Sequence, residues 1–103
     1  IKEIISKIDP YIEGMGLVFG SYAKKTEKKE SDLDIFIAGK YNRKEVDKIS
    51  QLYGLKINVK NYPVNIFKKN IRSDILIKEI LNNHIIFKGV EKFIEEAWKE
   101  IVK

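Results

Sequence analysis

Two short motifs constrain this chain more than any other feature of its sequence. Gly20-Ser21 ends an apolar segment, and after ten intervening residues Asp32-Leu33-Asp34 begins a second one. Alternate residues of a strand point to opposite faces, so Asp32 and Asp34 share one face and Leu33 enters a core on the other. The pattern predicts a strand that begins with two carboxylates on an open face and continues between apolar neighbours.

The paired carboxylates indicate a cation site. Two like charges at this separation repel each other unless a cation or a cationic side chain lies between them. Mg²⁺ prefers oxygen ligands and is commonly held by one or two carboxylates together with substrate phosphates. Asp32 and Asp34 are therefore candidate magnesium ligands, and the alternative is an ordinary pair of solvent-facing strand acids.

The glycine-serine pair indicates a phosphate-binding turn. Gly20 lets a ligand approach the backbone closely, and free amides at the start of a short helix attract phosphate. The Ser21 hydroxyl adds a donor, and Lys24 and Lys25 add positive charge. We expect Gly20, Ser21 and Lys24 to bind the phosphates of a nucleotide.

The two motifs together resemble the signature of the DNA polymerase β nucleotidyltransferase superfamily, in its minimal nucleotidyltransferase form. The segment LVFGSYAKK over residues 17–25, followed by SDLDI over residues 31–35, carries this resemblance. Many relatives have Arg-Gly where this chain has Lys24-Lys25.

The resemblance implies a function and a set of roles. Gly20 and Ser21 would hold the triphosphate, while Asp32 and Asp34 would be the catalytic residues that hold two Mg²⁺ ions. The reaction would transfer a nucleoside monophosphate, AMP from ATP or the equivalent from another nucleoside triphosphate, to a hydroxyl of a protein or small molecule.

A third carboxylate, which active relatives place on the next strand, is missing. In the candidate strand 55–60 the polar face carries Lys56, Asn58 and Lys60. Asn58 is the best match: its amide oxygen can contact a metal, but it carries no charge and cannot act as a general base. A carboxylate from elsewhere, such as Glu30, Asp47 or Asp74, would restore the set. A catalytically weak or inactive nucleotide-binding domain of a transcriptional regulator or antitoxin is therefore the alternative to an enzyme.

Downstream segments add a second resemblance. Residues 62–67, 75–81 and 84–89 resemble archaeal and bacterial proteins that fuse a winged helix to a nucleotidyltransferase domain. Minimal nucleotidyltransferases also act as antitoxins that adenylylate a HEPN ribonuclease toxin. The resemblance implies a HEPN-type toxin or a fused winged-helix domain as partner, with a homo-oligomer as a further possibility. The chain opens on Ile1, which is compatible with a domain excised from a longer protein.

Composition excludes several classes of function. The 103 residues include no cysteine, so disulfides and cysteine-based zinc sites are excluded. No apolar segment approaches the roughly 20 residues of a membrane span, and we expect a cytoplasmic protein. Basic residues outnumber acidic ones by 20 to 15, but only Arg43 and Arg72 are arginines, so direct nucleic-acid binding by this domain is not expected.

Hydrophobic periodicity predicts one α/β (α+β) domain over residues 1–103, with the nucleotidyltransferase fold. We expect a small mixed sheet of three or four strands with helices mainly on one face. The predicted strands are 15–20, 32–38, 55–61 and 84–88, with Gly39 ending the second. The predicted helices are 2–12, with an earlier end at Asp9-Pro10 as the alternative, a helix from Asn42 to Gly54, one from Ser73 to Leu81 and a C-terminal helix. Residues 65–70 are predicted to form a turn.

Overall fold

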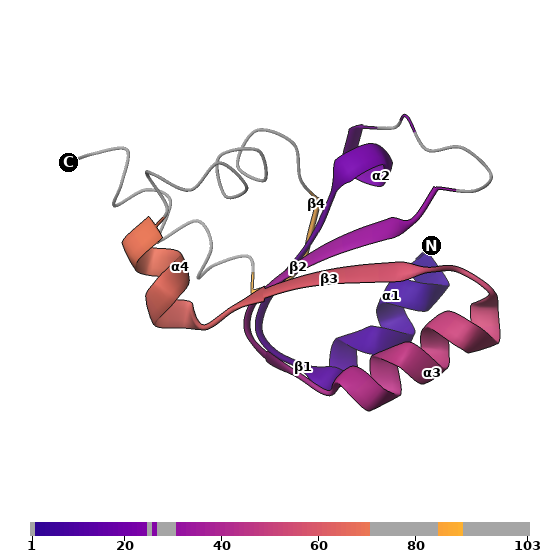
Figure 1. Ribbon diagram of the computed structural model, residues 1–103, viewed down its shortest axis with the longest axis horizontal. Coiled ribbons are helices and arrows are strands. Elements are labelled where there is room, and N and C mark those ends of the chain that lie inside the picture. Colours follow the sequence, from indigo (N-terminus) through magenta and orange to yellow (C-terminus); the bar gives the residue numbers. More distant parts are fainter. Residues whose placement is uncertain (1, 25, 27–30, 71–84, 90–103) are drawn as a thin grey trace.

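The computed structural model describes residues 2–24, 26, 31–70 and 85–89 of the chain (Figure 1). In chain order the elements are α1 (Lys2–Ile8), the 3-10 helix η1 (Asp9–Tyr11), β1 (Ile12–Phe19), α2 (Gly20–Lys24), β2 (Leu33–Tyr41), α3 (Arg43–Tyr53), β3 (Ile57–Tyr62), α4 (Val64–Asn70) and β4 (Ile85–Lys88).

The four strands form one mixed sheet in the order β3-β2-β1-β4. β1 is antiparallel to both β2 and β4, whereas β2 and β3 are parallel. A parallel connection needs a crossover, and α3 supplies it. The predicted α/β class and the predicted mixed sheet of three or four strands are confirmed, and the sheet has four.

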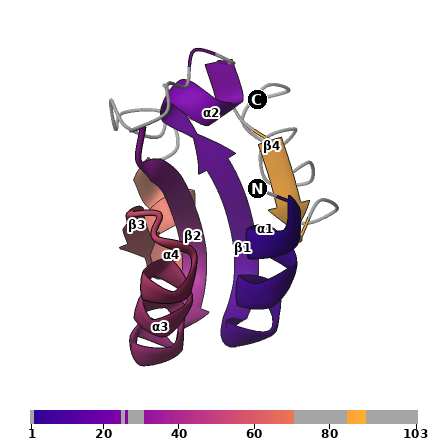
Figure 2. The same ribbon diagram turned by 90° about the vertical axis from the view of Figure 1, so that its right-hand side faces the viewer.

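Apolar side chains cover both faces of the sheet. Helices α1 and α3 pack against one face, where they lie beside each other (Figures 1 and 2). The buried residues on this side are Ile4, Ile8, Ile12, Val18, Leu33, Ile35, Ile37 and Val46. Because β2 is enclosed from both sides along its middle, its sequence is apolar from Ile35 to Ala38 without interruption.

The opposite face carries a smaller, aromatic core. Its buried residues are Met15, Leu17, Phe19, Phe36, Ala38 and Phe67. The ring of Phe36 lies 5.3 Å from that of Tyr62 in an edge-on arrangement and 5.5 Å from that of Phe67. Phe67 belongs to α4, so this helix packs on the side opposite to α1 and α3.

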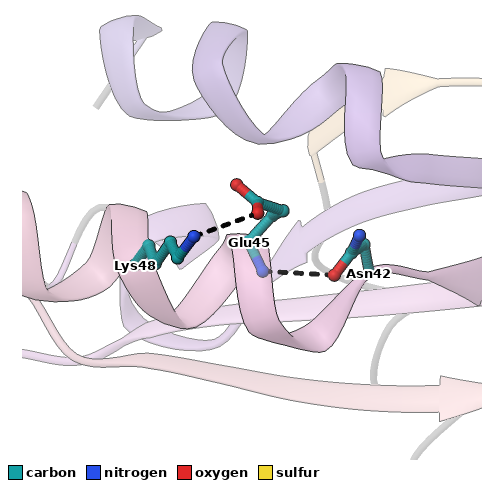
Figure 3. A network of polar contacts seen from close by, with 3 residues as sticks. All are labelled: Asn42, Glu45 and Lys48. Carbon is teal, nitrogen blue, oxygen red and sulfur yellow. Dashed lines mark hydrogen bonds and ion pairs between the residues drawn. The ribbon is translucent and has the colours of Figure 1, made fainter.

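Helix α3 begins and ends where its sequence predicts. The Asn42 side chain accepts a hydrogen bond from the Glu45 backbone N–H at 3.2 Å, and Lys48 pairs with the Glu45 carboxylate at 3.4 Å (Figure 3). Gly54 ends the helix with a φ of 61°, the left-handed conformation that favours glycine. Both caps rest on local hydrogen bonds, which is why the sequence alone locates them.

Several predicted boundaries are wrong. Helix α1 ends at Ile8, as the alternative of an early end at Asp9-Pro10 predicted, and not at residue 12. A 3-10 turn containing Pro10 follows, and β1 already begins at Ile12. β2 continues through Gly39, because Gly39 lets two backbones come together rather than ending a strand. A Cβ on Gly39 would collide with the backbone oxygen of Glu13 in the paired strand.

Residues 65–70 form a helix, α4, rather than the predicted turn. Its first turn closes with the Phe67 N–H donating to the Pro63 carbonyl at 3.0 Å, and the buried Phe67 ring anchors it. The predicted helix over residues 73–81 and the C-terminal helix lie outside the described residues. No helix in the described ranges is long and apolar enough to span a membrane.

Phe36→Ala tests whether the aromatic core stabilises the fold. Phe36 is fully buried, so the variant should lose about 3–5 kcal/mol of the free energy of unfolding in urea. Leu52→Ala is the control, because Leu52 is 78% exposed and should change stability by no more than about 0.5 kcal/mol. Equal losses in both variants would contradict the described packing.

Candidate active site

The candidate site lies where β1 ends and β2 begins. Antiparallel pairing places Phe19 opposite Asp34, so the next residue of the chain, Gly20, lies beside the Asp34 carboxylate. Gly20 has a φ of 71°, and a Cβ at this position would collide with Asp34 Oδ2. Any other residue here would therefore combine backbone strain with displacement of the carboxylate. The glycine of the first motif and an acid of the second are in direct contact.

The turn after Gly20 is closed by a backbone hydrogen bond. Ser21 is half-buried in α2, and its carbonyl accepts a hydrogen bond from the Thr26 N–H at 2.9 Å. Tyr22 packs against the apolar cluster under α1 and α3. Lys24 is the last residue of α2. The predicted phosphate-binding residues thus belong to one element next to the acids.

The acids lie on one sheet face, as their alternation predicts. Asp34 is the second residue of β2, and Asp32 immediately precedes the strand. Asp34 follows the same side of β2 as Phe36 and Ala38. Both carboxylates are half-buried.

The Asn58 side chain bridges the two carboxylates through hydrogen bonds. Parallel pairing sets Asn58 opposite Asp34, and its Nδ2 donates to Asp32 Oδ2 at 3.0 Å and to Asp34 Oδ1 at 3.2 Å. Both N–H donors of this amide group are therefore directed at carboxylates. The partial positive charge of the donors lies between the two negative charges and offsets part of their repulsion.

Lys60 also lines the site, although it was not among the site residues predicted from sequence. It lines the same cleft as Gly20, Asp34 and Asn58, and it lies opposite Phe36 on the neighbouring strand. Lys60 is two residues after Asn58 in the same strand, so the alternation of strand residues could have predicted that both side chains share the polar face of β3. Lys60 brings a positive charge to the rim of the acid pair.

The cleft also extends around the edge of β3. There the cleft is lined by Ile57 and Val59, which lie on the other side of β3 from Asn58, and by Arg43 and Asp47 at the start of α3. Only the part bounded by Phe19, Gly20, Asp34, Asn58 and Lys60 belongs to the candidate site, because Ile57 and Val59 pack on the side covered by α1 and α3.

A third carboxylate does not join the pair within residues 2–24, 26, 31–70 and 85–89. No group of three or more histidine, cysteine, aspartate or glutamate side chains comes together in these ranges. Asp47 is exposed on α3 and lies 3.9 Å from Arg43, so it does not replace the missing acid. Glu30 and Asp74 lie outside the described residues.

The oxygen donors that remain fit a magnesium ion that also binds a ligand. Asp32 and Asp34 supply two carboxylates, and the Asn58 amide can supply an uncharged oxygen if it turns. Mg²⁺ is commonly held by so few protein ligands when phosphates and water complete its shell. The Gly20-Ser21 turn adjoins these oxygen donors.

Fold and site together define a nucleotidyltransferase-type domain, with a glycine-serine turn and an acid pair on adjacent antiparallel strands. Residues 1–92 match the family model described as polymerase beta, nucleotidyltransferase, and the chain belongs to this family.

The fold is also similar to a solved structure. A chain from a crystal structure described as a toxin-antitoxin with AMP-PNP superposes with a TM-score of 0.66. The match covers 98% of this chain and 83% of the other, at 20% sequence identity. No curated protein matches the sequence.

Gly20→Ala and Gly54→Ala together test the contact between turn and carboxylate. Both glycines have a left-handed φ, so each variant should lose about 1–2 kcal/mol of unfolding free energy from backbone strain. A Cβ meets nothing within 4 Å at Gly54, whereas at Gly20 it meets Asp34. Urea unfolding should therefore show a larger loss for Gly20→Ala, and equal losses would contradict the contact.

Proposed function

We propose that this domain is a Mg²⁺-dependent nucleotidyltransferase that moves a nucleoside monophosphate, AMP from ATP, to a hydroxyl of a protein or small molecule. The observation that carries the proposal is the direct contact of Gly20 with the Asp34 carboxylate. A metal on the acids and phosphates on the turn would then be neighbours, which a metal-bound triphosphate requires. Membership of the family supports the same reaction class.

Each residue has a role in this proposal. The backbone of Gly20 and the hydroxyl of Ser21 would bind the triphosphate, with Lys24 adding positive charge. Asp32 and Asp34 would hold Mg²⁺, two ions if the domain is active, and these ions would supply charge stabilisation to the reacting phosphate. Lys60 lies at the cleft rim, where it can pair with a phosphate oxygen.

The transfer step forms one bond and breaks one. The acceptor hydroxyl oxygen forms a bond to the α-phosphorus, and the bond from this phosphorus to the bridging oxygen breaks. Pyrophosphate leaves, and the hydroxyl proton passes to water. The amide of Asn58 cannot take the proton, because an amide is not a base at neutral pH.

A second candidate function follows from Asn58. With an amide at the third-carboxylate position, the domain would bind a nucleotide through Mg²⁺ and transfer it slowly or not at all. It would then serve as the nucleotide-binding domain of a transcriptional regulator or antitoxin, with its output in a fused winged-helix domain. Measurable transfer separates the two candidates.

The proposed partner is a HEPN-type toxin, whose hydroxyl would be the acceptor. The similar fold in a structure described as a toxin-antitoxin with AMP-PNP supports both the partner and the nucleotide. We propose that the protein is cytoplasmic and that residues 1–103 act as one nucleotidyltransferase domain. Assembly into a homo-oligomer is a further proposal, which the molar mass in solution would test. Direct nucleic-acid binding by this domain is not part of the proposal.

Asp34→Asn is the variant that tests the proposed function. The domain is incubated with labelled ATP, Mg²⁺ and a HEPN toxin, and label on the toxin is counted. Loss of one metal ligand should reduce transfer by at least about 100-fold, since transfer depends on the bound cation. Calorimetry should show weakened Mg²⁺-ATP binding in the same variant.

Glu13→Gln is the matched control, because it removes a carboxylate charge from an exposed position of β1. It should transfer and bind like the wild type. Equal transfer by Asp34→Asn and wild type would contradict the proposed role of the acid pair. Binding without transfer by the wild type would select the second candidate.

A further inference from the structure

The contact of Asn58 with both acids has a chemical consequence. An amide has two different ends, and only its NH₂ end can face two anionic carboxylates favourably. That end faces Asp32 and Asp34 at 3.0 and 3.2 Å. The Asn58 amide thus supplies part of the charge compensation that a cation between the two acids would supply.

A bound cation would reverse this preference. A metal ion between the acids repels the NH₂ group and attracts the amide oxygen, since cations take oxygen ligands. The Asn58 side chain must therefore make a half-turn, or withdraw, before the carboxylates can hold a metal. Two charge-assisted hydrogen bonds are lost in that turn.

We infer that the Asn58 amide substitutes for a cation between Asp32 and Asp34, so that the site takes up a divalent ion only together with a nucleotide. The phosphates add the negative charge and oxygen ligands that the two acids alone lack. The inference deepens the proposed function, because it concerns the same site. It makes Asn58 a positioning residue that couples metal uptake to nucleotide binding.

The fold supports this role, because Asn58 is held in place. Its register opposite Asp34 is set by β3, whose neighbours in the strand, Ile57 and Val59, pack into the core under α1 and α3. Asn61, later in the strand, donates to the carbonyls of Ile37 and Gly39 at 3.1 and 3.0 Å and ties β3 to β2. The amide of Asn58 is therefore presented to the acids by a strand that is anchored on both sides of it.

Thermal unfolding without nucleotide tests the inference, with Mn²⁺ as the probe. Asn58→Ala removes the donors and leaves the carboxylates facing each other, and Asn58→Asp adds a third negative charge. Both should melt below the wild type in a chelator, with Asn58→Asp the lower, and both should be stabilised by Mn²⁺ more than the wild type. For Asn58→Asp we expect a gain of about 5 °C, which requires Mn²⁺ at roughly ten times its Kd.

Asn65→Ala and Asn65→Asp are the controls, because Asn65 is exposed on α4. Neither should change the response to Mn²⁺. If Asn58→Asp does not fold, Asn58→Ala still decides the question. An equal Mn²⁺ shift in the wild type and in Asn58→Ala would overturn the inference, as would a wild type that is strongly stabilised by Mn²⁺ alone.

The proposed function is judged separately, by calorimetry of the wild type with Mg²⁺-ATP. Failure to bind Mg²⁺-ATP would reject the proposed function and leave the melting series intact. Binding of Mg²⁺-ATP together with an Mn²⁺ response that Asn58 does not affect would keep the function and reject the inference.

Discussion

The antiparallel pairing of β1 with β2 decides how the Gly20 turn and the acid pair lie relative to each other. It sets Phe19 opposite Asp34, and the next residue, Gly20, therefore contacts the carboxylate. A slip of one residue in β2 would turn both acids toward the face covered by α1 and α3, which is apolar. Burying an unpaired carboxylate in this apolar core would cost much free energy. Packing of the two cores therefore fixes the register of β2, and the register fixes the positions of Asp32 and Asp34.

Parallel pairing of β2 with β3 adds the third member of the site. Helix α3 makes the crossover, and its capped ends at Asn42 and Gly54 fix where β3 can begin. Asn58 thus arrives opposite Asp34 and binds both acids through one amide group. The resulting site has two negative charges, a neutral bridge and Lys60 at its rim, and the proposal that it holds a metal-bound triphosphate rests on this arrangement.

Local chemistry made part of this structure predictable from sequence. The alternation of Asp32, Leu33 and Asp34 predicts the face that the acids share, and a cap depends on residues only a few positions apart. The sheet class and the four strands follow from similar patterns, whereas Asn58 was singled out by the family resemblance.

Features that depend on the tertiary structure were not predictable in this way. Gly39 allows two strands to approach each other, although in the sequence it looks like a strand end. Phe67 makes α4 a helix by entering a core that residues distant in sequence create. The direction of the Asn58 amide depends on carboxylates more than twenty residues away in sequence. Lys60 lies in the cleft because β3 pairs with β2, which also depends on residues distant in sequence.

A crystal structure of the domain with ATP and Mn²⁺, with anomalous scattering recorded for manganese, tests the central claim most directly. The account predicts an anomalous peak for a manganese ion bound by carboxylate oxygens of Asp32 and Asp34, with the triphosphate against Gly20 and Ser21. The Asn58 NH₂ group should no longer donate to the two carboxylates. A nucleotide bound elsewhere, or an acid pair still bridged by the amide without manganese, would contradict it.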